Sequence, residues 1–250
     1  MIKIKTDHEI AIMHEGGKIL RRVIDEVMSR AVPGSTTKEL DDLAEKLILE
    51  NGAEPAFKKV KDYFWTLCVP IDDEIVHTPP SDRILKQGDL LTVDIGVLYK
   101  GYNTDYATSI VVGGCADEKL TKFLEVGKET LEKAIKQAVV GNRIGDISAC
   151  IQSEIENAKY CIIRQLTGHG IGKRLHEDPY VFGYVNKPRE QTPKIENGMC
   201  LAIEIIYSFT STEIKYLDGV EWTIVTHDGS RSACFEKTIA IQKNSPFILT

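Results

Sequence analysis

Four acidic residues lie inside stretches that are otherwise apolar and typical of strands. Asp94 lies in VDIG, Asp105 in NTDYA, Glu204 in AIEI and Glu236 in FEKT. A buried carboxylate without a partner is costly and neighbouring carboxylates repel each other, so a positive partner is expected. His169 lies in TGHGIG, between glycines that let backbone approach closely. Four carboxylates and one imidazole form a ligand set whose negative charge two divalent cations would neutralise.

The pairing of two strands decides whether the aspartates meet. The stretch LLTVDIGVLYKGYNTDYATSIVVG, residues 90–113, reads as a hairpin around Lys100-Gly101. A two-residue loop pairs Tyr99 with Tyr102 and Gly96 with Asp105. Asp94 and Asp105 are then diagonal neighbours on one face, because side chains alternate along strands. A different loop length breaks this parity, and the competing interpretation is that the isolated acidic residues simply face solvent.

Composition limits the classes of function. The 250 residues carry a net charge of −6 and no long run of Lys and Arg, which argues against a nucleic-acid groove or an anionic membrane surface. The first residues, MIKIKTDHEI, hold no apolar signal segment, and no apolar run is long enough to span a membrane. The six cysteines form no CxxC pair, which is typical of reduced thiols. We therefore expect a soluble cytoplasmic protein.

Helix and strand patterns occur twice in the same order. Capping boxes at residues 6–9 and 36–39 begin two helices, which end before Pro33-Gly34 and at Asn51-Gly52. Two more helices are expected over residues 119–140 and 144–159. Strand-like runs follow each pair, at 64–69, 90–113, 160–166, 200–209, 222–226 and 234–242. The repeat favours one α+β domain over residues 1–250 with halves at about 1–113 and 114–250, although many α+β proteins give such a pattern.

With these motifs the chain resembles the type I methionine aminopeptidases over essentially its whole length. That resemblance implies the pita-bread fold, in which two pseudo-symmetric halves build an antiparallel sheet covered by helices. The family's metal ligands occur in the order Asp, Asp, His, Glu, Glu. In this sequence that order implies the metal ligands Asp94, Asp105, His169, Glu204 and Glu236, with Asp105 and Glu236 bridging.

The resemblance also implies the catalytic and substrate-binding residues. His77 in EIVHTPP and His176 in GIGKRLHEDP match histidines that contact the substrate and stabilise developing charge, and Glu204 would shuttle the proton. The family's methionine pocket is matched by Tyr63, Cys68, Leu175 and Trp222. Apolar, aromatic and sulfur-containing walls suit a thioether side chain. Cys68 and Trp222 are equally compatible with plain core positions.

The implied activity is removal of the initiator methionine from nascent proteins when the second residue is small. The oxygen-rich ligand set favours cobalt, manganese or iron, with zinc as the alternative. The implied partners are nascent polypeptide N-termini, with the ribosome as one candidate location. The implied state is a monomer that needs neither nucleic acid nor membrane.

Two other functions remain open from the sequence. An Xaa-Pro aminopeptidase or dipeptidase shares this fold but usually carries an additional N-terminal domain. A non-enzymatic binding protein on the fold tends to lose metal ligands, whereas all five are present here.

The chain departs from the family's usual residues beside several motifs. Thr78 replaces a usual Gly, Ile205 a Pro, Lys237 a His, Thr167 a Cys and Asp72 an Asn. None of these changes removes a ligand, so we expect them to affect substrate preference more than chemistry. Lys237 follows Glu236 on a strand, and alternation predicts that it points to the opposite face.

Overall fold

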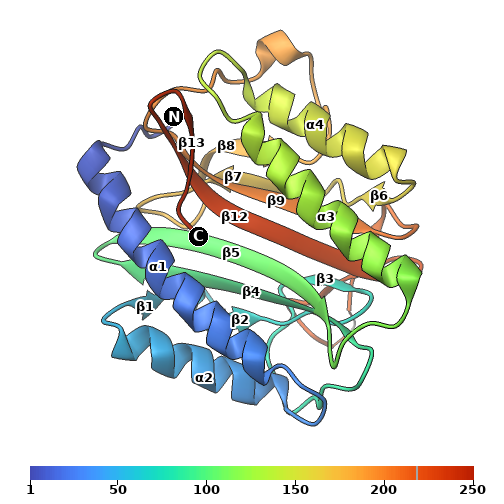
Figure 1. Ribbon diagram of the computed structural model, residues 1–250. Coiled ribbons are helices and arrows are strands. Elements are labelled where there is room, and N and C mark those ends of the chain that lie inside the picture. Colours follow the sequence, from blue (N-terminus) through green and yellow to red (C-terminus); the bar gives the residue numbers. More distant parts are fainter. Residues whose placement is uncertain (218) are drawn as a thin grey trace.

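The computed structural model describes residues 1–217 and 219–250 (Figure 1). Its α-helices are α1 (Asp7–Arg30), α2 (Thr37–Glu50), α3 (Glu118–Lys136) and α4 (Ile144–Asn157). Both predicted capping boxes are confirmed, since Thr6 with Glu9 and Thr36 with Glu39 exchange side-chain and backbone hydrogen bonds. The third helix ends four residues before the predicted Val140. Its last turn is tightened by bonds from Gln137 N to Ala134 O and from Ala138 N to Ile135 O.

Most strands belong to one large sheet with the order β1-β4-β5-β12-β9-β7-β8, to which β2, β6 and β13 are attached at β4, β9 and β12. These strands are β1 (Glu54–Pro55), β2 (Leu67–Cys68), β4 (Leu90–Tyr99), β5 (Tyr102–Val111), β6 (Cys161–Ile162), β7 (Thr167–Gly170), β8 (Glu177–Phe182), β9 (Cys200–Ser208), β12 (Ser232–Gln242) and β13 (Ser245–Ile248). A smaller sheet has the order β10-β11-β3, with β3 (Glu74–Val76), β10 (Ile214–Tyr216) and β11 (Ile224–Thr226). Two short 3₁₀ helices, Phe57–Lys59 and Arg189–Gln191, lie in connections.

The central hairpin has the predicted register. Tyr99 pairs with Tyr102 and Gly96 pairs with Asp105, around the two-residue loop Lys100-Gly101. Both loop residues have positive φ, 47° and 81°, as tight hairpin loops require. The expectation that Asp94 and Asp105 share one face of the sheet therefore holds.

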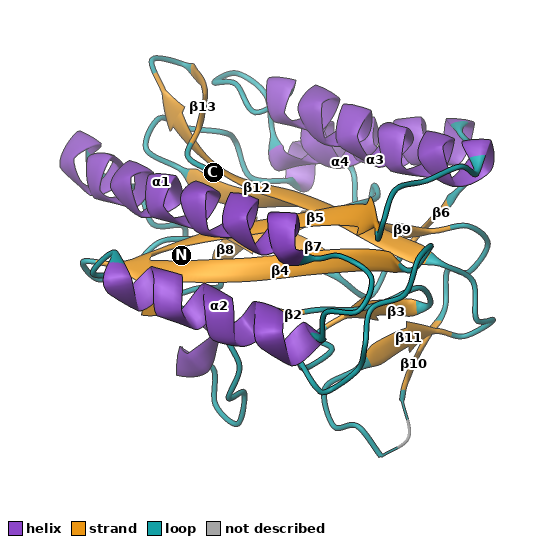
Figure 2. Cartoon of the chain, turned by 60° about the horizontal axis from the view of Figure 1, so that its bottom comes forward, coloured by secondary structure: helices purple, strands orange, loops and turns teal. Residues whose placement is uncertain are grey.

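The helices all cover the same face of the large sheet (Figures 1 and 2). Val93 and Ile95 of β4 are buried with residues of α1 and α2, while Ile203 and Ile205 of β9 are buried with residues of α3 and α4. Because side chains alternate, the acidic residues between these apolar ones point to the opposite face. The predicted α+β pita-bread fold is confirmed. The matched helix pairs support our proposal of one domain with two halves.

Three predicted strands are shorter than their apolar runs. The runs at 64–69, 160–166 and 222–226 contain strands of only two or three residues. In the first run the amides of Thr66 and Leu67 donate to the Asp41 carboxylate, each at 2.8 Å, instead of extending a ladder. The apolar composition predicted burial there correctly. The hydrogen-bond acceptor for these backbone amides, however, is a side chain of α2 and not a neighbouring strand.

Two features noted in the sequence have simple structural counterparts. All six cysteines are free thiols, three of them buried. Within residues 1–217 and 219–250, no helix combines the length and apolar character that crossing a membrane requires.

Candidate active site

Three of the four acidic residues occupy one row that runs across four neighbouring strands. Ladder pairing places Asp94 of β4 opposite Ala107 of β5, Ala107 opposite Glu236 of β12, and Glu236 opposite Glu204 of β9. Directly paired residues share a face of the sheet, so the three carboxylates point to the same side. The small Ala107 side chain leaves space between Asp94 and Glu236.

A second row lies two residues along the same strands. Asp105 of β5 is held by Thr238 of β12, whose hydroxyl accepts from Asp105 N at 2.8 Å and donates to Asp105 O at 2.9 Å. Thr238 pairs with Ala202, and Ala202 pairs with His169 of β7. Asp105 and His169 therefore lie on either side of Thr238 and Ala202, on the same face of the sheet as the first row.

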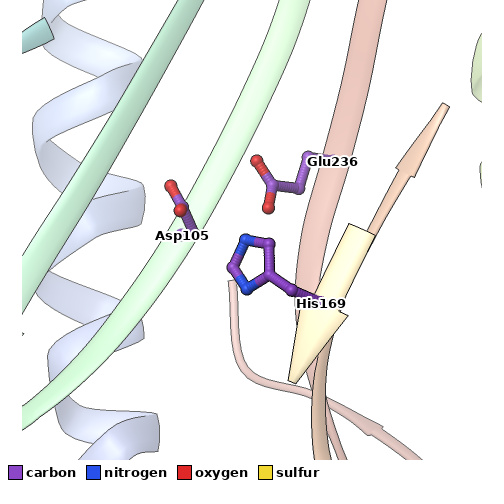
Figure 3. Close-up of side chains that lie close together, drawn as sticks. All are labelled: Asp105, His169 and Glu236. Carbon is purple, nitrogen blue, oxygen red and sulfur yellow. The ribbon is translucent and has the colours of Figure 1, made fainter. Parts of the chain in front are cut away.

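Three side chains from the two rows lie close together on this face of the sheet. Asp105, His169 and Glu236 are buried, and their ligand atoms lie within 4.8 Å of one another. Figure 3 shows the three side chains turned towards one another from β5, β7 and β12. Glu204 joins them, because its Oε1 lies 3.4 Å from His169 Nε2. This spacing suits cations held by several ligands at once.

The tautomer of His169 follows from its hydrogen bond with the backbone carbonyl of Gly170. His169 Nδ1 lies 2.9 Å from Gly170 O. A carbonyl oxygen only accepts, so Nδ1 carries the proton and Nε2 presents its lone pair to this cluster of side chains. Burial, followed by the nearby His176, lowers the pKa of His169 to about 4. The ring is therefore neutral at pH 7, as a metal ligand must be.

The carboxylates are electrostatically unfavourable without a cation. Burial is the largest cause that raises the pKa of Asp94, Asp105, Glu204 and Glu236, and repulsion from the neighbouring carboxylates raises it further. Asp94 Oδ1 and Glu236 Oε1 are buried and accept no hydrogen bond within the described residues. Such buried acceptors need a partner. The donor set of oxygens and one imidazole therefore fits divalent cations.

A pocket opens above the two rows. Its cavity volume is about 250 Å³, large enough for one amino-acid side chain and its backbone. All five predicted metal ligands and all six predicted substrate-binding residues line it: Tyr63, Cys68, His77, Asp94, Asp105, His169, Leu175, His176, Glu204, Trp222 and Glu236. The structure thus brings every predicted site residue to one place, while the individual roles remain predictions.

One wall of the pocket is aromatic. The Tyr63 ring lies edge-on to Trp222, with centroids 5.3 Å apart and planes at 87°. Tyr63 OH donates to Leu67 O at 2.7 Å and contacts Cys68 Sγ at 3.2 Å, which fixes the ring. Trp222 Nε1 donates to Asp62 O at 3.2 Å. These bonds satisfy the polar atoms of the wall and leave its apolar surface facing the pocket.

The two predicted catalytic histidines lie on loops at the edge of the pocket. His77 follows β3 directly and has a φ of 60°, a conformation that is costly for a residue with a side chain. His176 precedes β8, and its ring centroid lies 4.4 Å from that of His169. Both rings line the same pocket as the carboxylates, so both can reach a bound peptide.

Burial gives His77 an unusual titration. Its pKa is lowered to about 4, mainly by burial and secondarily by His176. We predict that the ring Hε1 resonance of His77 in the metal-free protein titrates at about 4, not at the value of about 6.5 for an unperturbed histidine. An NMR titration with the His77→Gln variant for assignment measures this directly. A midpoint near 6.5 would show that the ring is open to water.

Several pocket residues were not predicted from the sequence. Thr92, Ile206 and Cys234 line the pocket, and each lies two residues from a predicted ligand on the same strand. Strand alternation could have found these three. Phe57 and Gln165 come from a 3₁₀ helix and a loop, where no periodic signal exists.

The departures from the family's usual residues lie mostly outside the pocket. Lys237 faces the helix side, in a shallow hollow with Arg21 and Arg22, so its predicted orientation is correct. Ile205 is buried beneath the helices, and Asp72 pairs with Arg231 at 2.8 Å. Only Thr167 lines the pocket. Thr78 does not, although its carbonyl accepts from Val69 N and so fixes the loop after His77.

Comparison with known proteins settles the family. The profile of metallopeptidase family M24 matches residues 11–243. The chain belongs to this family. It is 40% identical over 250 residues to methionine aminopeptidase 1 of Bacillus subtilis, covering 100% of this chain and 99% of that protein.

Solved structures of similar proteins agree with this placement. The methionine aminopeptidase of Thermotoga maritima superposes with a TM-score of 0.95 at 38% identity, covering 100% of this chain and 99% of that one. A prolidase from Pyrococcus furiosus shares the fold with a TM-score of 0.79 at 24% identity, but the match spans only 65% of that chain. The resemblance inferred from the sequence motifs is confirmed, as is the prediction of a metal-dependent aminopeptidase.

Proposed function

We propose that this chain removes the N-terminal methionine from polypeptides whose second residue is small. The observation that carries the proposal is the position of the ligand rows at the floor of an apolar pocket with an aromatic wall. A peptide whose first side chain fills the pocket has its α-amine and first carbonyl beside the carboxylates. The methionine aminopeptidases that match along the full chain support the same substrate.

The five predicted ligands would hold two divalent cations, with Asp105 and Glu236 shared between them. Asp105 and Glu236 lie close to each other and to His169, whereas Asp94 and Glu204 flank Glu236 on the outer strands. When bound, such cations neutralise the carboxylates, polarise the scissile carbonyl and lower the pKa of water. Cobalt, manganese and iron suit this donor set, with zinc as the alternative.

Glu204 is the residue best placed to move a proton. Its side chain is 14% exposed, whereas Asp105 and Glu236 are more deeply buried. A group that accepts a proton from water and donates it to the leaving amine must reach both. Glu204 also lies 3.4 Å from His169 Nε2, so it borders the proposed ligand set as well as the pocket.

His77 and His176 would stabilise the charge that develops on the scissile group. Burial lowers the pKa of both rings below the ordinary histidine value, so both are neutral at pH 7 and each can donate one N–H without repelling the cations. The strained backbone of His77 aims its ring across the pocket towards Trp222, at a centroid distance of 6.4 Å.

The cellular setting is part of the same proposal. Nascent polypeptide N-termini are the natural source of peptides that begin with methionine, and the cytoplasm, including the ribosome surface, is where they occur. We propose that the enzyme acts there as a monomer, without nucleic acid or membrane. All the residues proposed for the site come from a single chain.

A peptide series tests the proposal. We expect cleavage of Met-X-Ser peptides when X is Gly, Ala or Ser, and little when X is Leu or Lys, because we propose that the loops bearing His77 and His176 confine the side chain of the second residue. Replacing the first Met by Leu should lower kcat/KM by about 10–200-fold, the usual range for near-isosteric apolar side chains. Equal rates for X as Ala and Lys would contradict the assignment.

The same assay separates the alternatives. An Xaa-Pro peptidase would cleave Ala-Pro and leave Met-Ala-Ser intact, whereas a binding protein would cleave neither at saturating metal. The chain is 40% identical to methionine aminopeptidase 1 of Bacillus subtilis but only 24% identical to the prolidase, which favours the methionine substrate.

A further inference from the structure

A buried ion pair ties the start of the chain to the loop that carries His176. Lys5 Nζ lies 2.8 Å from Glu177 Oε2, and the two side chains are only 5% and 4% exposed. Removing both ions from water costs several kcal/mol per ion, by order of magnitude, so a pair this buried adds little net stability. A role beyond stability is therefore worth seeking, and Glu177 directly follows His176.

Both oxygens of Glu177 are committed. Oε2 accepts from Lys5, and Oε1 accepts from the Arg174 amide at 3.1 Å, inside the loop. The loop spans residues 171–176, between the end of β7 at Gly170 and the start of β8 at Glu177. One carboxylate therefore fixes the C-terminal end of the loop, where Leu175 and His176 reach the pocket.

Lys5 itself is anchored to the body of the sheet. Its amide donates to Gly198 O at 2.7 Å, in the turn before β9. Its aliphatic stem covers Gly172, where an added Cβ would lie 2.4 Å from Lys5 Cε. The N-terminal segment thus packs on the loop and braces it through Lys5, which lies 172 residues before Glu177 in the sequence.

A separate contact fixes the other end of the loop. Asn103 Nδ2 donates to the carbonyls of Gly172 at 3.0 Å and Lys173 at 3.2 Å. Asn103 lies on β5, two residues before Asp105. The first part of the loop is therefore held by the strand that carries a ligand, and the second part by Lys5 and Glu177.

We propose that Lys5 and Glu177 are positioning residues for His176: the buried pair holds the His176 ring at the distance from the carboxylate rows that the reaction needs. The expected loss of rate rests on the proposed function, whereas the placement of the ring does not. A misplacement of about 1 Å in such a group costs up to about 10²-fold in rate. The effect should fall on kcat, because His176 is proposed to act on the developing charge and the pocket is built largely by other residues.

The test is a double-mutant cycle on Met-Ala-Ser at saturating Co²⁺, below the melting temperature of each variant. We expect Lys5→Met to lower kcat by about 10-fold with KM changed less than about threefold. The matched control is Lys3→Met, which removes an exposed lysine of the same segment and should leave kcat unchanged. In a His176→Ala background, Lys5→Met should cost less than about twofold.

Two outcomes overturn the proposal: an unchanged kcat in Lys5→Met, or an equal loss in both backgrounds, since the residue would then act independently of His176. If Lys5→Met does not fold, Glu177→Gln is run through the same cycle, because it preserves the shape of the side chain.

A readout without turnover keeps this inference separate from the proposed function. We expect Lys5→Met to shift and broaden the Hε1 resonance of His176 and to leave that of His77 in place. If the wild type fails to cleave Met-Ala-Ser, the proposed function is wrong. The spectrum still tests whether Lys5 positions the His176 ring. A His176 resonance that is identical in wild type and Lys5→Met would refute it.

Discussion

Glu204→Gln is expected to lower kcat for Met-Ala-Ser by about 10²-fold or more, the usual contribution of a general acid–base group. Glutamine preserves the shape of the side chain but accepts no proton from water. Glu204 is the test of choice, because it lies 3.4 Å from His169 and is more exposed to the pocket than Asp105 or Glu236. The assay measures kcat and KM together, and the loss should appear in kcat.

The variant also removes one negative ligand, so metal content must be measured beside turnover. Assays at saturating Mn²⁺ or Co²⁺, with bound metal counted by mass spectrometry, separate loss of the cation from loss of the proton acceptor. Glu221→Gln is a suitable control, since it makes the same change at an exposed position next to Trp222. Near-normal turnover of Glu204→Gln with full metal occupancy would remove Glu204 from the mechanism.

Much of the site was predictable because its residues lie on strands. A side-chain period of two fixes which residues share a face, and a two-residue loop fixes the register, so the meeting of Asp94 and Asp105 followed from sequence alone. The capping boxes predicted both helix starts in the first half for a similarly local reason. Family resemblance then supplied His77 and His176, which lie on loops and have no periodic signal.

The contacts that were missed depend on distant segments. The amides of Thr66 and Leu67 bond to a carboxylate on α2, which a strand pattern cannot reveal. Lys5 contacts Glu177 over a separation of 172 residues, and the local sequence of neither residue indicates this burial. Tertiary contacts of this kind place polar groups where local propensity gives no indication.

Removal of divalent cations is expected to abolish turnover and to make the stability of the protein fall as the pH rises. In the metal-free fold, burial and mutual repulsion raise the pKa of all four site carboxyls. Above the ordinary carboxyl pKa the unfolded chain has released protons that the folded chain retains. A rise in pH therefore favours unfolding, and stability is lost as the pH passes through the raised folded-state values.

The pH window can be chosen to isolate the carboxyls. His77 and His169, with folded-state pKa values of about 4, oppose the trend below about pH 7, where an unfolded histidine still binds a proton. Burial also lowers the pKa of His14 and His176, which act in the same direction. Between about pH 7 and 8 the histidines are largely neutral and the thiols largely protonated in the unfolded chain, so both kinds of group contribute little to the slope. Calorimetric melting temperatures of the chelated protein across this window should therefore decrease.

Added metal should reverse the sign of this dependence. Ligands bind a cation only when deprotonated, so the affinity for Co²⁺ or Mn²⁺ rises with pH while the intrinsic stability of the metal-free fold falls. At a metal concentration about 100-fold above Kd, binding adds about 2.7 kcal/mol to the free energy of unfolding. For a domain of this size that corresponds to a rise of roughly 5–10 °C in melting temperature.

Asp94→Asn separates the electrostatic cause from general loosening of the fold. Asn is nearly isosteric and removes one of the four charges, so the metal-free variant should be more stable than wild type at pH 8. The same variant should gain less from added metal, because a ligand is lost. The stability of the metal-free protein should thus rise while the stabilisation by metal falls. We expect this because the site is arranged to bind cations and destabilises the metal-free fold. A melting temperature of the metal-free wild type that rises between pH 7 and 8 would contradict this account.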